Sequence, residues 1–239
     1  MPAEYPSGCA SDGDLANMFI DFFGEKIIVL RNSLDSTSDI VLESNAIVHQ
    51  CALSCFKSAT LSDASELLGR MTIKSYALDP VPASVLKQCT SVLLPVMTQI
   101  VNQSLNLATF PDCFNLALLN PLLKKPTLDV EVLSKFRPIS NLMFMSKLIE
   151  KVVASQLINH ISSNGLDEIL PSAYKQFHST ETALVKVFND IVLDVDMNRT
   201  VILLLLDLSA AFDTVDHTIL IERLANRFGL CMRSSSGLV

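Results

Sequence analysis

Apolar residues recur at helical spacing along much of this chain. The first such series predicts an amphipathic helix over residues 14–34. Its members are Leu15, Met18, Phe19, Phe22, Phe23, Ile27, Leu30 and Leu34. The same spacing returns over residues 84–107, where Pro95 is expected to kink or divide the helix because proline has no backbone N–H. The pattern therefore predicts a mostly helical chain.

Capping residues indicate where two of the helices should begin. Asp63, with Glu66 three residues later, matches a capping box and predicts a short helix that starts there. In "FRPISNLMFMSKLIEKVVASQLINHI" the segment FRPIS is expected to be a loop that leads into a long helix. Ser140 or Asn141 would be the N-cap of that helix.

Two further helices are predicted towards the C-terminus. In "STETALVKVFNDIVLDVD" the start could be capped by Ser179 with Thr182, or by Thr180 with Glu181. The segment "TILIERLANRFGL" has apolar residues at helical spacing, and Gly229 is expected to end it.

Short strands are predicted in two places. The segment "LALLNPLLKKP" has the length and flanking prolines of a strand that runs into a basic tip. The segment "TVILLLLD", residues 200–207, is an uninterrupted apolar run, typical of a strand buried on both faces. It ends in Asp207.

A carboxylate at the end of a buried strand should be paired, hydrogen-bonded or bound to a cation, because burial makes its charge costly. For Asp207 that cation would be a hard metal such as Mg²⁺. The alternative, that Asp207 caps the following turn, stays open. Asp213 and Asp216 are expected to be solvated or capping residues, and His217 a surface histidine.

Composition narrows the class of protein. The 239 residues suffice for one large domain or two small ones, and 49% of them are hydrophobic. The net charge of −7 means that any binding to nucleic acid must depend on a local basic surface. The six cysteines are scattered, which predicts neither a disulfide framework nor a zinc site. The start lacks a secretory signal and the longest apolar run is too short to span a membrane, so we expect a soluble intracellular protein.

The segment "LLDLSAAFDTVDH" resembles motif A of the reverse transcriptases of LINE-type (non-LTR) retrotransposons, in the jockey-like and chicken-repeat-like branch. Three further parts of the chain are similar to blocks of the same enzymes, in matching order. They are "LDPVPASVLKQC" with "TFPDCFNLALLNPLLKK", "NPLLKKPTLDVEVLSKFRPISNLMFMSKLIEKVVASQL", and "SAYKQFHSTETALVKVFNDI". The resemblance covers roughly residues 15–230. It implies an RNA-directed DNA polymerase, a nucleotidyltransferase that uses an RNA template and a DNA primer.

The resemblance also implies roles for individual residues. Asp207 matches the catalytic motif A aspartate, which binds both Mg²⁺ ions of a two-metal phosphoryl transfer. Phe212 matches the aromatic residue that blocks a ribose 2′-OH, with a plain core phenylalanine as the alternative. Arg137 matches a fingers arginine near the incoming triphosphate, and Lys124 and Lys125 lie at the adjoining strand end.

The local charge balance gives modest independent support for phosphate contact. Between residues 124 and 151, six basic residues outnumber three acidic ones. The basic residues are Lys124, Lys125, Lys135, Arg137, Lys147 and Lys151. A solvated helix face would explain Lys147 and Lys151 equally well.

The resemblance implies a truncated enzyme. Members of the family continue past "LIERLANRFGL" into motif B and a "YADD"-like motif C, which supplies the other metal-binding carboxylates, whereas this sequence stops at Val239. Three hypotheses follow: a partial reverse transcriptase that is inactive alone, a fragment of an active polymerase with a truncated gene model, or a recruited nucleic-acid-binding or interaction module without catalysis. Whether the chain is itself an enzyme stays open.

The fold expected from the resemblance is α+β and mostly helical, a partial right-hand polymerase. Residues 1–120 would form a helical extension, 121–200 a fingers-like region, 201–230 the start of the palm, and 231–239 a non-homologous tail. The palm strand would lack its natural partners and leave apolar surface exposed. Neither the oligomeric state nor the choice between nucleus and cytoplasm follows from the sequence.

Overall fold

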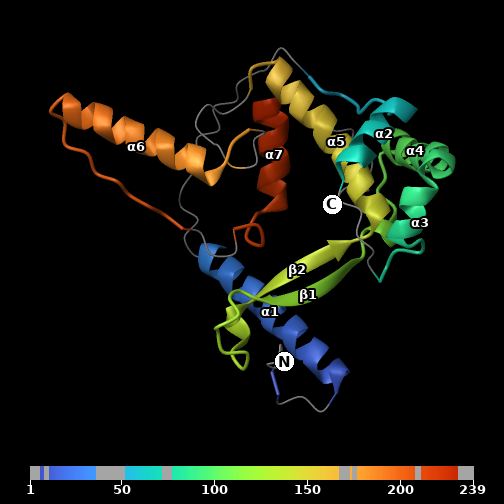
Figure 1. Cartoon of the computed structure of the whole chain (residues 1–239), viewed down its shortest axis with the longest axis horizontal. Helices are drawn as coiled ribbons and strands as arrows, with labels where there is room; N and C mark the ends of the chain where they lie inside the picture. Colours follow the sequence, from blue (N-terminus) through green and yellow to red (C-terminus); the bar gives the residue numbers. More distant parts are fainter. Residues whose placement is uncertain are drawn as a thin grey trace.

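The computed structural model describes residues 6–7, 11–35, 52–71, 77–166, 173, 177–207 and 211–230. Within these residues the chain forms helices and one two-stranded sheet, so the expected helix-rich α+β character is confirmed (Figure 1). The helices are α1 (Asp12–Asp35), α2 (Leu61–Arg70), α3 (Ala83–Gln88), α4 (Thr90–Leu107), α5 (Phe144–Ser163), α6 (Thr180–Asp196) and α7 (His217–Phe228), with short 3-10 turns η1 (Asp112–Phe114) and η2 (Leu133–Lys135). The strands are β1 (Ala117–Leu123) and β2 (Phe136–Leu142).

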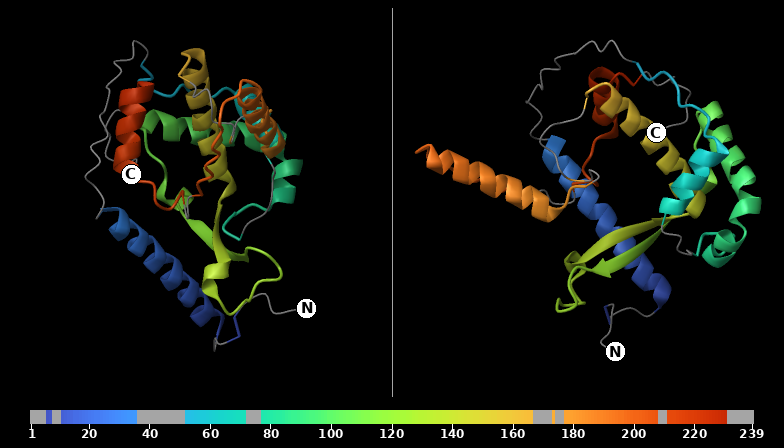
Figure 2. Two further views of the ribbon diagram at one scale, coloured as in Figure 1. Left: turned by 90° about the vertical axis from the view of Figure 1, so that its left-hand side faces the viewer. Right: turned by 45° about the horizontal axis from the view of Figure 1, so that its top comes forward.

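The larger hydrophobic core lies where α2 and α4 pack against α5. Leu148 and Val152 are one turn apart on α5 and are 0% and 2% exposed. They share this core with Val101 of α4 and Leu68 of α2. Figure 2 shows the three helices grouped together in both views. Burial of this apolar surface fixes the relative positions of α2 and α5.

Two amide side chains hold the extended segment 52–60 on this helical group. Asn102 of α4 donates to the carbonyl of Ala59 at 3.0 Å and accepts from its N–H at 2.7 Å. Gln156 of α5 makes the same pair of bonds with Lys57, at 2.8 and 2.7 Å. Each amide thus satisfies both backbone groups of one residue, as a neighbouring strand would.

The capping box predicted for α2 is present, one turn earlier than expected. Thr60 is the N-cap, and its hydroxyl accepts from the N–H of Asp63 at 3.1 Å. Asp63 accepts from the Thr60 N–H at 2.9 Å, so it occupies the third helical position and is not the N-cap. Glu66 instead forms an ion pair with Arg70. The sequence "TLSD" contains both residues of this capping box, so the predicted N-cap was three residues too late.

Replacing Thr60 with alanine should lower the free energy of unfolding by about 1 kcal/mol, because the N–H of Asp63 in the first turn of α2 loses its partner, the Thr60 hydroxyl. Hydrogen bonds from Thr60 hold the pKa of Asp63 below its ordinary value of 3.8. A lowered carboxyl pKa contributes stability above the unfolded value that disappears as the pH falls through the folded value. The difference between wild type and Thr60→Ala in urea denaturation should therefore shrink in acid below pH 3.8. Ser62→Ala, an exposed change in the same turn, should show neither effect.

The break in the helix expected over residues 84–107 falls at Cys89. Pro95 lies inside α4, whereas Cys89 separates α3 from α4 with φ −102° and ψ 16°. The Thr90 hydroxyl donates to the Leu86 carbonyl at 2.6 Å, satisfying an acceptor at the end of α3. The prediction that the helix divides is confirmed, but the division falls at Cys89 and not at Pro95.

A smaller core joins α1 to the β hairpin. The helix predicted over residues 14–34 is confirmed as α1, which crosses the hairpin in Figure 1. Phe19 and Phe23 of α1 are buried with Phe136 of β2, and the Phe19 and Phe136 rings meet edge to face at 5.0 Å between centroids. Ser7 adds a link by donating its N–H and hydroxyl to Glu131 beside the hairpin, at 3.0 and 2.8 Å.

The strand predicted in "LALLNPLLKKP" is confirmed as β1, but the loop predicted for FRPIS was wrong. That segment belongs to β2, which pairs antiparallel with β1 in a register that places Leu123 opposite Phe136 and Pro121 opposite Pro138. Proline cannot donate to a ladder and is tolerated in edge strands. Both strands of a two-stranded sheet are edges, so the two prolines fit here.

The N-cap expected at Ser140 or Asn141 was also wrong, because both residues lie inside β2. Met143 is the N-cap of α5 and provides no side-chain hydrogen bond. A carboxylate oxygen of Asp79, distant in sequence, accepts from the N–H of Phe144 at 2.7 Å instead. The start of α5 is therefore capped through a tertiary contact.

The last two helices begin and end as predicted. Ser179 caps α6 with Thr182, the first of the two alternatives. Asp216 caps α7 by accepting hydrogen bonds from the N–H groups of Thr218 and Ile219. Gly229 ends α7 with φ +67°. The His160 side chain on α5 bonds the Phe228 carbonyl at 2.8 Å, which ties the end of α7 to the helical group. Helix α6 has no buried residue and projects from the other elements (Figure 1).

The strand predicted over residues 200–207 is absent: in the described structure these residues have no regular secondary structure. Ile202 is 89% exposed, and Leu205 and Leu206 are each 82% exposed. An apolar segment forms a strand only where another strand satisfies its backbone groups, and among the described residues the sheet contains only β1 and β2. The expected exposure of apolar surface here is confirmed.

None of the described helices is long and apolar enough to cross a membrane.

Candidate nucleotide and nucleic-acid site

The structure brings together three of the predicted site residues at one end of the β hairpin. Lys124 and Lys125 directly follow β1, and Arg137 is the second residue of β2, opposite Leu122. All three are exposed. Because side chains alternate along a strand, Arg137 lies on the face opposite to Phe136, and so away from the core formed with α1.

Hydrogen bonds fix the backbone of this basic end. The N–H of Lys124 donates to the Lys135 carbonyl at 2.9 Å, which continues the ladder by one pair beyond the strands. The Lys124 ammonium donates to the Ser134 carbonyl, also at 2.9 Å. Residues 124–137 contain four basic and two acidic residues, a local net charge of +2. A local positive surface on an otherwise acidic chain is suited to contact with phosphate.

Asp207 and Phe212 lie elsewhere, in the connection between α6 and α7. Asp207 is exposed, and no hydrogen bond or ion pair among the described residues joins it to the hairpin. Phe212 is 76% exposed, so the alternative of a core phenylalanine does not hold in this structure. The turn that Asp207 could cap includes residues 208–210, outside the described part of the chain. Asp207 and Phe212 thus belong to a different part of the described chain from the hairpin residues Lys124, Lys125 and Arg137.

The described residues do not form a complete site for the expected metal. Nowhere among them do three or more His, Cys, Asp or Glu side chains gather as a metal-binding group. Two-metal phosphoryl transfer uses ions about 3.5–4 Å apart, which several ligands must share. One exposed carboxylate, Asp207, does not supply them. The residues present therefore do not fit the pair of Mg²⁺ ions.

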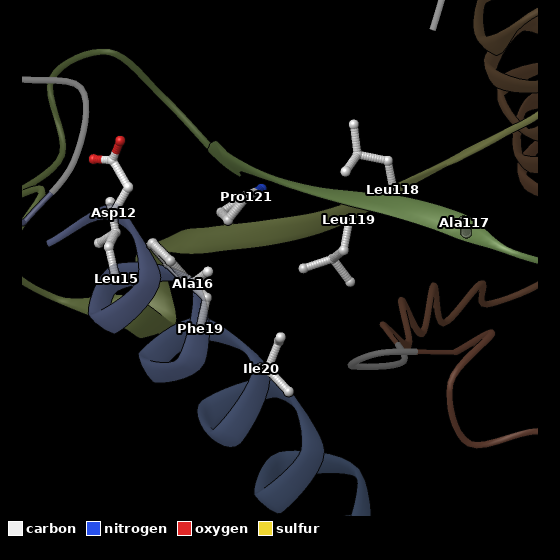
Figure 3. A pocket seen from close by; sticks show the side chains of 9 residues that line it. All are labelled: Asp12, Leu15, Ala16, Phe19, Ile20, Ala117, Leu118, Leu119 and Pro121. Atoms are coloured by element: carbon white, nitrogen blue, oxygen red, sulfur yellow. The ribbon is translucent and has the colours of Figure 1, made fainter. Parts of the chain in front are cut away.

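An apolar groove of about 390 Å³ lies between α1 and β1 (Figure 3). Figure 3 shows Phe19 and Ile20 of α1 facing Leu119 and Pro121 of β1. Asp12 at its margin is the one charged residue among those that line it. Without a basic or nucleophilic side chain, this groove has no evident catalytic chemistry.

Sequence reasoning missed Arg70, which lines a second groove together with Lys147 and Lys151. Arg70 is far from the other two in sequence and is the last residue of α2. A single basic residue at a helix C-terminus is common, because it interacts favourably with the helix dipole. Nothing in the sequence around Arg70 therefore indicated a site. The packing of α2 on α5 is what brings Arg70 to the same groove as Lys147 and Lys151.

Part of this chain is similar to known proteins. Residues 123–233 match the family model described as reverse transcriptase (RNA-dependent DNA polymerase). The chain is 25% identical, over 139 residues, to a protein of Drosophila melanogaster named probable RNA-directed DNA polymerase from transposon X-element. That alignment covers 58% of this chain but only 15% of the fly protein. No solved structure matches. All five candidate residues lie within 123–233, and these similarities support a reverse transcriptase domain of the transposon type in this part of the chain.

Proposed function

We propose that this chain contains part of a reverse transcriptase domain of a LINE-type (non-LTR) retrotransposon, in the jockey-like and chicken-repeat-like branch. The observation that carries this proposal is the family match over residues 123–233, which contains the segment "LLDLSAAFDTVDH". In this proposal residues 1–120 are an upstream helical extension, 121–200 the fingers, 201–230 the start of the palm and 231–239 a tail. The substrates are an RNA template, a DNA primer and deoxynucleoside triphosphates.

The proposed roles follow from the chemistry of each side chain. Arg137 presents a planar set of donors that suits a triphosphate, and Lys124 and Lys125 add positive charge at the same end of the hairpin. In a complete polymerase Asp207 would be the catalytic carboxylate and the metal ligand, and Phe212 would contact the sugar of the incoming nucleotide. In the structure the 201–207 segment has no regular secondary structure, so assembly of the site requires this segment to join a sheet.

We further propose that the 239-residue chain alone does not synthesise DNA. A two-metal site needs several carboxylates to share the ions, and Asp207 is one exposed carboxylate. The 201–207 segment also has no strand partner among the described residues, so no strand pairing holds Asp207 in place.

The direct test is primer extension by the purified 239-residue chain on an RNA template with Mg²⁺ and deoxynucleotides. We expect no more product than from an Asp207→Asn variant, which keeps the size of the side chain and removes its charge. A known reverse transcriptase serves as the positive control for template and primer. Templated product from wild type that is absent with Asp207→Asn would show that the chain is an active polymerase and contradict the proposed inactivity.

A further inference from the structure

A second groove of about 390 Å³ lies between the end of α2 and the outer side of α5. Its lining includes three basic residues, although the chain as a whole is acidic. The lining residues are Arg70, Met71, Lys147, Glu150, Lys151 and Ala154. The groove is separate from the basic end of the hairpin, and no residue of the hairpin lines it.

The groove is built on rigid parts of the fold. Leu68 of α2 is two residues before Arg70, and Leu148 of α5 directly follows Lys147. These two leucines are 5% and 0% exposed and belong to the same core. Lys147 and Lys151 are four residues apart on α5, so they lie on one face of the helix. The convergence of the basic side chains is therefore set by a buried core and not by flexible loops.

Two of the basic residues in this groove have a spacing that brings like charges together. Like charges at positions i and i+4 of a helix destabilise it slightly, and Lys147 and Lys151 have that spacing. Glu150 compensates in part, but its burial raises its pKa, against the lowering effect of the two lysines. Arg70 is paired with Glu66. A bound anion would reduce the repulsion between Lys147 and Lys151.

We propose that Arg70, Lys147 and Lys151 bind a phosphate group of a nucleic-acid backbone, as a contact site additional to the hairpin end. Arginine offers planar paired donors that match phosphate, and the two lysines supply mobile ammonium groups beside it. The inference rests on the proposed function, in which the chain binds RNA. It assigns this groove to backbone contact, which positions a strand and does not read its sequence.

The test measures binding of a fluorescein-labelled single-stranded RNA to the full chain by anisotropy at several KCl concentrations. Lys147→Ala, Lys151→Ala and Arg70→Ala should each weaken binding several-fold. Each lysine change should also reduce the slope of log K against log salt by about 0.7, the value for one phosphate contact on a single strand. Glu150→Gln should strengthen binding, because it removes a negative charge from the groove. Circular dichroism melting of each variant checks that the fold is retained.

Lys186→Ala is the matched control, because Lys186 is an exposed helical lysine paired with Asp190 on α6. It should change neither the affinity nor the slope. If the groove variants bind RNA like wild type while Lys124→Ala and Arg137→Ala weaken binding, this inference is overturned and the proposed function stands. If wild type binds no RNA, both fail. If inorganic phosphate binds the groove at concentrations that leave the hairpin contacts intact, and the affinity for RNA does not change, the groove binds free phosphate and not RNA. That outcome would overturn the inference.

Discussion

Asp207→Ala should abolish DNA synthesis by a chimera in which a segment with motifs B and C from a close relative follows residue 230. The added strands would give the exposed 201–207 segment the partners that it lacks here, and the added carboxylates would complete a site for two metal ions. In that setting Asp207 becomes a ligand that both ions share. Single-nucleotide incorporation on a primed RNA template measures the effect, and we expect product at background level.

Phe212 gives this experiment a second, qualitatively different readout. Phe212→Val should leave incorporation of deoxynucleotides in place and chiefly relax the discrimination against ribonucleotides. Asp213→Asn and Asp216→Asn are the charge-matched controls. Asp216 caps α7 through its side-chain oxygen, a role that asparagine can keep, so little change is expected. Activity retained by Asp207→Ala would refute the whole motif A assignment, and an unchanged sugar preference in Phe212→Val would refute the gate alone.

Phe136→Ala should detach α1 from the β hairpin. Phe136 is 2% exposed and meets the buried Phe19 ring edge to face, so truncation leaves a cavity and removes an aromatic pair. The expected cost is about 3–5 kcal/mol for the unit that these residues form. Hydrogen exchange followed by mass spectrometry should show faster exchange in residues 12–35 and 117–142. Exchange in α4 and α5 should change little, because their core is separate.

Leu122→Ala is the matched control for this prediction. Leu122 lies on β1 next to Leu123, the partner of Phe136, but it is 44% exposed and points to the opposite face. Its truncation should have a much smaller effect on exchange. If Phe136→Ala and Leu122→Ala accelerate exchange equally, the α1 packing is not what stabilises the hairpin.

Much of the helical framework could be predicted from the sequence, since it depends on interactions within a few residues. The apolar spacing over residues 14–34 predicted α1 to within about one turn. Ser179, Asp216 and Gly229 set helix ends through bonds to neighbouring backbone groups. Even the error at Asp63 was one of register, because Thr60 and Asp63 form a local reciprocal pair.

The candidate site was predictable only in part. The proximity of Lys124, Lys125 and Arg137 was expected from the family resemblance, and the pairing of β1 with β2 produces it here. The metal and sugar roles of Asp207 and Phe212 stay predictions. They depend on where the 201–207 segment lies, and an apolar run in sequence does not specify which strand it pairs with.

The remaining features depend on contacts between distant parts of the chain, which no local pattern encodes. FRPIS is a strand because β1 offers it a ladder, although its proline and polar residues suggest a loop. Asp79 caps α5 from 65 residues away, and Arg70 meets Lys147 only because α2 and α5 share a core. The 201–207 segment shows the converse. Its sequence favours a strand, but strand formation needs hydrogen-bonding partners, and the described fold places none beside it.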